Sequence, residues 1–478
     1  MNVRLGWAAA LVAAALGCAG PEAEELDPAR SESEFRSRTL SDPGLARFAE
    51  ANRGKESGPF PPERWDLGAL TLVAFYYHPD LDLARARLTQ VRAGRVTAGM
   101  WPNPVVGFEG SRVANVEPGF TPWIYGANLS FPVDTLWKRG YRVEEADRLT
   151  EAGALALAEA GWKVRSRVRA ALAEHVFAAR ELGLRRAEEA AREKVVRAME
   201  RKLALGDVFR LDVDVAQGDL LASRLAIHTA EGKVAESRAA LASALGVPAP
   251  ALREARIDWP ELDRPPSEES LGAETVLGPA LRSRLDLRAL LAEYRASVSA
   301  LGREMASRFP DVSIAPGYTY DQGQKKLNLG LSVTIPILNQ NEGPIAEAEA
   351  RRREVAARFA AAQAGAIGEL EAALERYRAA LAELGEAGKS LELLSSRERA
   401  LRRAVELGDL EATAVLGIAL EVVKAEQSRL ESLRHAEDAL GAVEDAVQRP
   451  HGARGGGSAV PETSPREPAP RGGGGDPP

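Results

Sequence analysis

The chain has 478 residues, of which 45% are hydrophobic and 27% are charged, and its formal net charge is −7. This composition excludes a wholly disordered chain, because disordered proteins contain too few hydrophobic residues to form a core. Acidic and basic residues are mixed along the sequence, and no basic arm or patch is available to bind nucleic-acid phosphates. We therefore expect no nucleic-acid partner.

The N-terminus has the pattern of an export signal. A short basic start at residues 1–4 is followed by an apolar run at residues 5–16. This run is too short to cross a bilayer as a permanent helix. We predict a signal peptide at residues 1–17.

Cys18, the only cysteine in the chain, follows this signal directly. Its position resembles a lipobox, in which the cysteine is acylated after cleavage, for example with palmitate. Lipoboxes usually carry leucine where this chain has Ala15. Under the alternative interpretation, ordinary signal peptidase cleaves near residues 13–15 and Cys18 is an incidental thiol. We favour lipid attachment at Cys18, and the following Ala19 is typical of lipoproteins sorted to the outer membrane.

Two further segments have compositions that do not suit a packed core. Residues 18–64 are rich in Pro, Glu, Ser and Gly, which predicts a lipidated tether. Residues 449–478 contain glycine runs and several prolines, which predicts a disordered tail. The fold is therefore expected between residues 65 and 448.

Short strings recur in the same order along the chain, which indicates an internal duplication. The recurring pairs are Leu81-Asp82-Leu83 with Leu285-Asp286-Leu287, Trp101-Pro102-Asn103 with Phe309-Pro310-Asp311, Phe131-Pro132 with Ile335-Pro336, and Leu205-Gly206-Asp207 with Leu407-Gly408-Asp409. Their offsets are 204, 208, 204 and 202 residues, which is too long for a solenoid repeat. We predict a first repeat at 65–247, a connector at 248–277 and a second repeat at 278–448.

Two proline-free stretches rich in Ala, Leu, Glu and Arg predict long helical hairpins at about 138–246 and about 345–447. The first limb of the first hairpin would be roughly 100 Å long, and that of the second roughly 90 Å, at the helical rise of 1.5 Å per residue. Two shorter helices are expected at 208–245 and 279–307, of roughly 57 and 43 Å. Stacked end to end, these two would equal one long limb, so we expect a tall cylinder of continuous and two-piece helices.

Each hairpin is interrupted once, at the Leu-Gly-Asp string, and these positions predict the turns at the hairpin tips. Gly206 and Gly408 would end the first helix of each hairpin, because glycine adopts the left-handed conformation of a helix end without strain. Asp207 and Asp409 would then cap the following helix.

Four proline-bounded stretches alternate between apolar and polar residues, which predicts strands at about 105–114, 124–132, 311–320 and 326–336. Each is about as long as a tilted transmembrane β-strand. In the fourth stretch, one face carries the side chains of Leu327, Leu329, Leu331 and Val333.

This alternation allows two interpretations. A transmembrane barrel would turn the apolar face of each strand, Leu327 to Val333 included, toward lipid and the small polar face toward water. A soluble antiparallel sheet with one buried face produces the same pattern. Aromatic residues near the strand ends favour the membrane, where they would form an interfacial girdle. Because four strands cannot close a barrel, the membrane interpretation requires several copies of the chain.

Several strings resemble the TolC-like outer-membrane factor family, also called outer-membrane efflux proteins. They are His78-Pro79-Asp80-Leu81, Trp101-Pro102-Asn103-Pro104, Leu331-Ser332-Val333-Thr334-Ile335-Pro336-Ile337, Asn339-Gln340-Asn341 and the run at 343–348 that opens the second long helix. The resemblance covers roughly residues 65–448, and it is specific because the strings fall at matching places in both halves.

The resemblance implies a mainly α fold with a small β part. Long helical hairpins would form a periplasmic α-barrel, and four strands per chain would contribute to a trimeric twelve-stranded transmembrane β-barrel. It implies a homotrimer in outer-membrane lipid that docks with a periplasmic adaptor (membrane fusion) protein and an inner-membrane pump. The chain would be a passive exit duct of a tripartite efflux or secretion system.

Members of this family commonly narrow the periplasmic tip with acidic residues near the Leu-Gly turns. Asp212 and Asp214 lie just past the first turn and are the candidate gate, whereas the corresponding stretch at 412–417 carries small residues. The alternative is that both aspartates are solvated charges on a helix face. The two interpretations are equally compatible with the sequence.

No pattern in the sequence indicates catalysis. The five histidines lack metal-ligand spacing, and no glycine-rich phosphate loop follows a predicted strand. We therefore expect no enzyme, metal or cofactor. The competing function is that of a periplasmic coiled-coil adaptor or structural scaffold, but such a protein would carry one hairpin. Two hairpins, each preceded by a pair of strands, favour the channel.

Overall fold

A computed structural model of the protein describes residues 25–52, 59–133, 135–271, 278, 281–407, 410–411 and 413–451. The predicted signal peptide, Cys18 and the predicted tail beyond residue 451 lie outside the described residues. The chain divides into two units, Met1–Thr39 and Leu40–Pro478. The first unit contains helix α2 (Pro28–Arg36), whose N-terminus is capped by Asp27.

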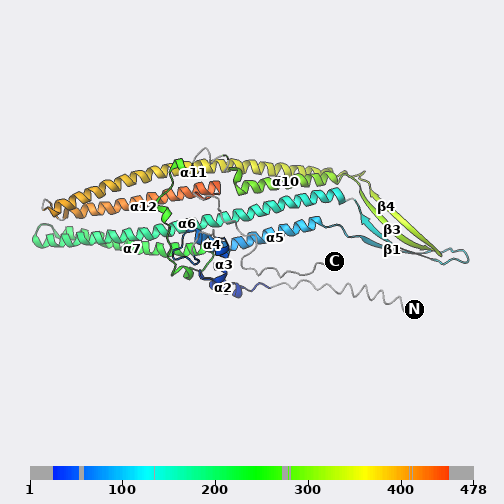
Figure 1. Ribbon diagram of the computed structural model, residues 1–478, viewed down its shortest axis with the longest axis horizontal. Helices are drawn as coiled ribbons and strands as arrows, with labels where there is room; N and C mark the ends of the chain where they lie inside the picture. Colours follow the sequence, from blue (N-terminus) through cyan, green and yellow to red (C-terminus); the bar gives the residue numbers. More distant parts are fainter. Residues whose placement is uncertain are drawn as a thin grey trace. The chain divides into compact units, whose positions relative to one another are not determined.

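The second unit combines long helices with one small sheet (Figure 1). Its elements are α3 (Pro43–Asn52), α4 (Leu67–Tyr77), α5 (Pro79–Gly99), β1 (Val105–Arg112), β2 (Trp123–Pro132), α6 (Thr135–Leu205), α7 (Arg210–Leu245), the 3-10 helices η1 (Ala249–Leu252) and η2 (Pro260–Asp263), α8 (Glu268–Leu271), α10 (Leu285–Ala306), β3 (Asp311–Asp321), β4 (Gln324–Thr334), α11 (Glu342–Glu406) and α12 (Thr413–Val447). The predicted fold class, mainly α with four strands, is confirmed. The order helix, strand pair, long helix and shorter helix occurs twice, from α5 to α7 and from α10 to α12.

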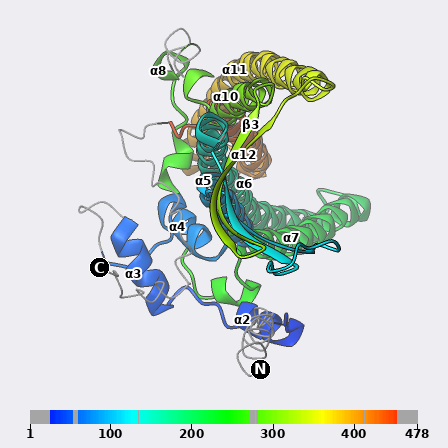
Figure 2. The same cartoon turned by 90° about the vertical axis from the view of Figure 1, so that its right-hand side faces the viewer.

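The two long helices form the frame of the unit. Helix α6 has 71 residues and α11 has 65, so each is on the order of 100 Å long. Helices α5 and α7 both pack on α6, while α10 and α12 each contact both α6 and α11. Viewed down the long axis, these helices form a curved wall (Figure 2).

The shorter helices stack end to end, but with other partners than the sequence predicts. Helix α7 ends at Gly246, which has the left-handed φ of 73° and lies against the backbone at the start of α5. A Cβ at Gly246 would be 2.9 Å from the carbonyl oxygen of Tyr77 and 3.0 Å from Cα of His78. Helix α7 is therefore continued by α5.

In the second repeat, α12 meets the start of α10 in the same way. The amide of Leu285 donates to Oε1 of Gln448 at 2.7 Å, and Nη1 of Arg284 donates to the carbonyl of Ala446 at 2.8 Å. The predicted stacking of 208–245 on 279–307 is wrong, because each short helix meets another helix of its own repeat.

The main hydrophobic core surrounds helix α4. Helix α4 is buried on all sides, and its residues pack on α6 and α7 through side chains such as Leu70, Leu172 and Leu241. A second cluster joins α11 to α12 around Leu370, Tyr377 and Leu440. The hydroxyl of Tyr377 donates to the carbonyl of Pro266, which ties the connector onto this cluster.

Candidate functional site

The strands form one antiparallel sheet in the order β1-β2-β3-β4. Strands β1 and β2 belong to the first repeat, and β3 and β4 belong to the second. The β2–β3 pairing, in which Tyr125 lies opposite Tyr320, therefore joins the two repeats. Each repeat contributes one hairpin of two strands.

The register gathers most apolar side chains of the strands on one face, whereas Val105 and Ile124 lie on the other face. The residues of the apolar face are Val106 and Phe108 on β1, Tyr125, Ala127, Leu129 and Phe131 on β2, Val312, Ile314, Pro316, Tyr318 and Tyr320 on β3, and Leu327, Leu329, Leu331 and Val333 on β4. Many of these side chains are strongly exposed, with Leu327 at 89%, Phe108 at 81% and Leu329 at 77%. The four residues of β4 that the sequence singles out thus share one exposed apolar face.

The opposite face of the sheet carries small and polar side chains. Nδ2 of Asn328 donates to Oγ1 of Thr319 at 2.7 Å across β3 and β4. Asn128 fills the space beside Gly107, where a Cβ would be 2.5 Å from the Asn128 amide oxygen. Nearer the β3–β4 turn, Nζ of Lys326 pairs with the carboxylate of Asp321 at 2.6 Å. This face is therefore suited to water, whereas the first face is not.

The ends of the strands are marked by aromatic side chains and tight turns. Strands β3 and β4 are joined through Gln322 and Gly323, which both have positive φ, as short hairpin turns require. At the same end, the guanidinium of Arg112 lies 5.8 Å from the ring centroid of Trp123. At the end nearer the helices, the guanidinium of Arg139 lies 4.8 Å from the ring centroid of Trp101.

Both outer edges of the sheet are open within the described chain. Strand β1 pairs only with β2, and β4 pairs only with β3, among the residues that the structure describes. An unpaired strand edge presents a row of amide and carbonyl groups that require partners. In a bilayer these groups would have no water to bind, so another strand must supply the partners.

At the tip of the first helical hairpin, the structure contradicts the predicted role of Asp207 as a helix cap. Gly206, with φ of 84°, directly follows the last residue of α6. Asp207 does not cap α7, because α7 begins at Arg210 and Phe209 occupies its N-cap position. The amide of Asp207 instead donates to the carbonyl of Lys202 at 2.9 Å, so this residue belongs to the end of α6.

Both candidate gate residues make contacts within α7. Oδ2 of Asp212 accepts a hydrogen bond of 2.8 Å from the amide of Phe209, so Asp212 stabilises the start of the helix. Asp214 pairs with Arg210 one turn before it, at 2.9 Å. At the second tip, Gly408 and Asp409 lie outside the described residues.

Charged residues outside the predicted sites join α6 of the first repeat to α12, and to a residue just before α12, in the second repeat. The guanidinium of Arg169 on α6 donates to Oε2 of Glu437 on α12 at 2.9 Å, and both side chains are almost completely buried. Nearer the tip, Nζ of Lys202 pairs with the exposed carboxylate of Glu411 at 2.9 Å. For Arg169 and Glu437, the only signal in the sequence is a charged residue at a core-facing position of a helix, and this signal does not identify the partner.

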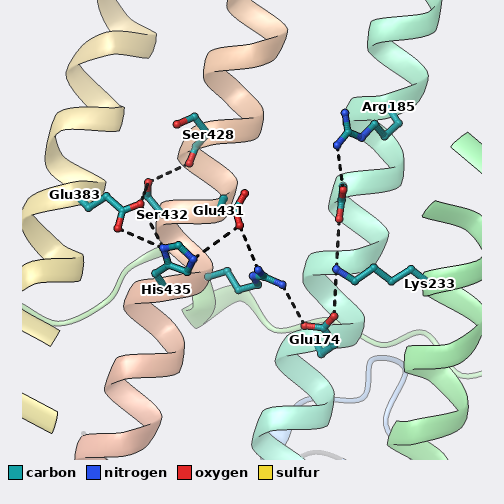
Figure 3. Close-up of polar contacts among 10 residues, drawn as sticks. Glu174, Arg185, Lys233, Glu383, Ser428, Glu431, Ser432 and His435 are labelled. Carbon is teal, nitrogen blue, oxygen red and sulfur yellow. Dashed lines mark hydrogen bonds and ion pairs between the residues drawn. The ribbon is translucent and has the colours of Figure 1, made fainter. Parts of the chain in front are cut away.

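Between these two contacts, polar side chains cross the wall from α11 to α7 (Figure 3). The residues, in spatial order, are Glu383, His435, Glu431, Arg434, Glu174, Lys233, Glu181 and Arg185. In each successive pair, the side-chain nitrogen of one residue lies 3.3 to 3.8 Å from a carboxylate oxygen of the other. Because most of these side chains are partly exposed, each pair contributes at most about 1 kcal/mol.

The described part of the chain offers neither a metal-binding cluster nor a membrane-spanning helix. Among its residues, no group of three or more His, Cys, Asp and Glu side chains is placed to hold a metal ion. No helix within this part is both long and apolar enough to cross a membrane.

Comparisons with known proteins agree with this geometry. The family model described as outer membrane efflux protein matches residues 74–247. The fold is similar to the outer membrane protein VceC from Vibrio cholerae, which is 19% identical with a TM-score of 0.63 over 80% of this chain and 95% of VceC. The CmeC outer membrane channel from Campylobacter jejuni is 16% identical, with a TM-score of 0.61 over 85% of this chain and 91% of CmeC. The MtrE outer membrane channel from Neisseria gonorrhoeae is 18% identical, with a TM-score of 0.62 over 80% of this chain and 89% of MtrE. The search of curated proteins gave no match.

Proposed function

Since residues 74–247 belong to the outer membrane efflux protein family and the chain has the TolC-like fold, we propose that the protein is the outer-membrane exit channel of a tripartite efflux or secretion system. An inner-membrane pump and a periplasmic adaptor would deliver the substrate. The protein itself would catalyse no reaction and would provide a passive path through the outer membrane.

The observation that carries this proposal is the four-stranded sheet with one exposed apolar face and two open edges. Lipid against the apolar face and water against the polar face would satisfy the side chains of both faces. Closing the sheet with copies of itself would pair β1 of one chain with β4 of the next. Three copies would then form a closed barrel of twelve strands.

The helical wall supports the same assembly, because its lateral edges are also uncovered. Along α7, the exposed side includes Leu211, Val215 and Leu225, which are 60–71% exposed. Along α11, the exposed side includes the small residues Ala364 and Gly368. Small residues let two helices approach closely, so the α11 edge of one chain would fit against the α7 edge of the next. Three curved walls would enclose a periplasmic tunnel.

Attachment at Cys18 would add a lipid anchor to this barrel. The predicted tether at 18–64 is too long, because Leu45 and Phe48 of α3 are buried in the hydrophobic core, so the residues before Leu40 would connect the acylated cysteine to the fold. Because the barrel would hold the protein in the membrane independently, lipidation would assist targeting and would not be required for retention.

The experiment that tests this proposal is a determination of mass and location for the purified full-length protein. We expect outer-membrane fractionation and a trimer in detergent that dissociates on heating. A monomer that fractionates with soluble periplasmic proteins would instead support the adaptor or scaffold function and contradict the channel.

A further inference from the structure

Strand β1 turns the backbone groups of its even-numbered residues toward the open edge of the sheet. The amide of Val113, just after β1, donates to the carbonyl of Pro122 at 2.8 Å, so the odd-numbered residues on this side bond to β2. In an antiparallel sheet, the N–H and C=O groups of successive residues point to alternate sides. Val106 and Phe108 therefore present these groups at the edge, where no strand of the described chain pairs with them.

Strand β4 turns its odd-numbered residues toward the other open edge. The amide of Val133, just after β2, donates to the carbonyl of Val312 on β3 at 2.7 Å, so the even-numbered residues of β3 bond to β2. The odd-numbered residues of β3 must then bond to β4, and the register places Ser313 opposite Ser332. The residues of β4 between these bonding positions, such as Val333, have their amides and carbonyls at the edge.

The residues that point to the two edges are also those of the exposed apolar face. They include Val106 and Phe108 on β1 and Leu331 and Val333 on β4. Directly opposite residues of an antiparallel pair have their side chains on the same face. If β4 of one chain pairs odd residues with even residues of the next chain's β1, the backbone bonds form and the apolar face stays continuous. A shift by one residue loses both.

The pairing of β2 with β3 supplies a template for this seam, because it is the same kind of contact between successive repeats. The duplicated strings at the ends nearer the helices relate β2 to β4 by an offset of 204 residues and β1 to β3 by 208. In the sheet, Phe131 of β2 lies opposite Ile314 of β3. The same offsets lead from these two residues to Ile335, just after β4, and to Val106 of β1.

We propose that β4 of one chain pairs with β1 of a second copy in the register that places Ile335 opposite Val106. This inference rests on the proposed trimer and specifies how its chains join. The register pairs even residues of β1 with odd residues of β4, as both the edge-directed backbone groups and the apolar face require.

The side chains that this register brings together are complementary on both faces. On the apolar face, Phe108 lies opposite Val333, and an aromatic and a β-branched side chain form a favourable cross-strand pair. On the water face, Glu109 lies opposite Ser332, whose hydroxyl would donate to the carboxylate. Within the described part of the chain, no hydrogen bond or ion pair engages the Glu109 side chain.

The two nearest registers of the same parity fit less well. A shift of two residues in one direction places Glu109 opposite Gly330, which has no side chain to bind a carboxylate. A shift in the other direction places Val106 opposite Ile337. The amide of Ile337 donates to the carbonyl of Ile335 at 2.9 Å, so the chain has already left the strand at this point.

Disulfide cross-linking of the full-length protein in isolated membranes tests this register. The background is Cys18→Ser, which removes the only native cysteine. On mild oxidation, Glu109→Cys combined with Ser332→Cys should form disulfides between chains, because such a pair has its Cα atoms about 4.5 Å apart, within the reach of a disulfide. Three such bonds close a ring, so a covalent trimer should appear on a denaturing gel and disappear with reductant.

A second pair in the same register lies on the apolar face. Phe108→Cys combined with Val333→Cys has an expected Cα separation of about 5.5 Å and should also give the covalent trimer. This pair keeps the test decisive if the first double variant does not assemble.

Two control pairs report the shifted registers. Ser111→Cys with Asn328→Cys reports one shift, and Glu109→Cys with Thr334→Cys reports the other. In the proposed register these are diagonal neighbours, about 7–8 Å apart, so both should give little covalent trimer. A shifted pair that cross-links as efficiently as Glu109→Cys with Ser332→Cys would overturn the register.

The oligomeric state of the wild-type protein separates this inference from the proposed function. If the wild type is trimeric but neither expected pair gives a covalent trimer, the register is wrong and the channel stands. Disulfides that leave the chain monomeric on the gel would mean that β4 closes on β1 of its own chain, which also overturns the inference. Wild-type protein that is itself monomeric in the membrane would contradict the channel and the seam together.

Discussion

Tyr125 and Tyr320 stack across the boundary between the two repeats, with ring centroids 4.9 Å apart and an interplanar angle of 18°. They are direct partners in the β2–β3 register, and β2 and β3 are the two central strands of the sheet. This pair therefore contributes to the contact that makes one sheet out of two hairpins.

Replacing Tyr320 with alanine should weaken this boundary. Aromatic pairs across strands contribute on the order of 1 kcal/mol, so we expect Tyr320→Ala to lower the temperature at which the assembled protein unfolds. Tyr320→Phe retains the stacked ring and should unfold close to the wild-type temperature. Equal losses in both variants would mean that the hydroxyl, and not the stacking, stabilises the boundary.

Local patterns in the sequence predict the elements of the fold well. Alternation around Leu329 predicts a strand where β4 lies, and Gly206 predicts the end of α6, because both depend on neighbouring residues. Contacts between distant segments are not predictable in this way. Arg169 and Glu437 are separated by 268 positions, and no local pattern pairs them.

The same reason explains the two corrections. The residue that caps α7 depends on where the turn ends, so local preference alone points wrongly to Asp207. Helix α5 continues α7 because both pack on α6. The lengths of the helices, from which the sequence pairs them, do not show which helices pack on α6.

A pair of substitutions in neighbouring residues of β4 tests the assignment of the two faces. Leu329→Arg places a cation on the proposed lipid face, at a cost of roughly 2–4 kcal/mol near the bilayer midplane, and should impair trimer assembly. Asn328→Arg places the same cation on the proposed water face and should assemble normally with altered conductance. The yield of heat-sensitive trimer measures both. Similar yields from both variants would contradict a transmembrane sheet.

The proposed gate is tested by removing the charge of Asp212 while keeping a hydrogen-bond acceptor. Asp212→Asn can still accept from the Phe209 amide, so the tip should remain folded. If three copies of Asp212 line the constriction, the variant should show lower cation selectivity and weaker block by divalent cations in single-channel recordings. Unchanged reversal potential and block would mean that Asp212 serves only the helix start.

The lipid anchor is tested by Cys18→Ser. We expect the variant to lose incorporation of labelled palmitate, because the acylated thiol is absent, and to remain in the membrane fraction through its barrel. Labelling that persists in the variant, or that is missing in the wild type, would contradict acylation at Cys18.

If copies of this chain close into a water-filled channel, the purified wild-type protein must conduct ions across a planar bilayer. We predict discrete, uniform conductance steps that appear only with the trimeric fraction. Leu329→Arg, purified in parallel, should give few insertions because its sheet cannot enter lipid. Trimeric wild-type protein that inserts without any conductance steps would contradict a water-filled channel.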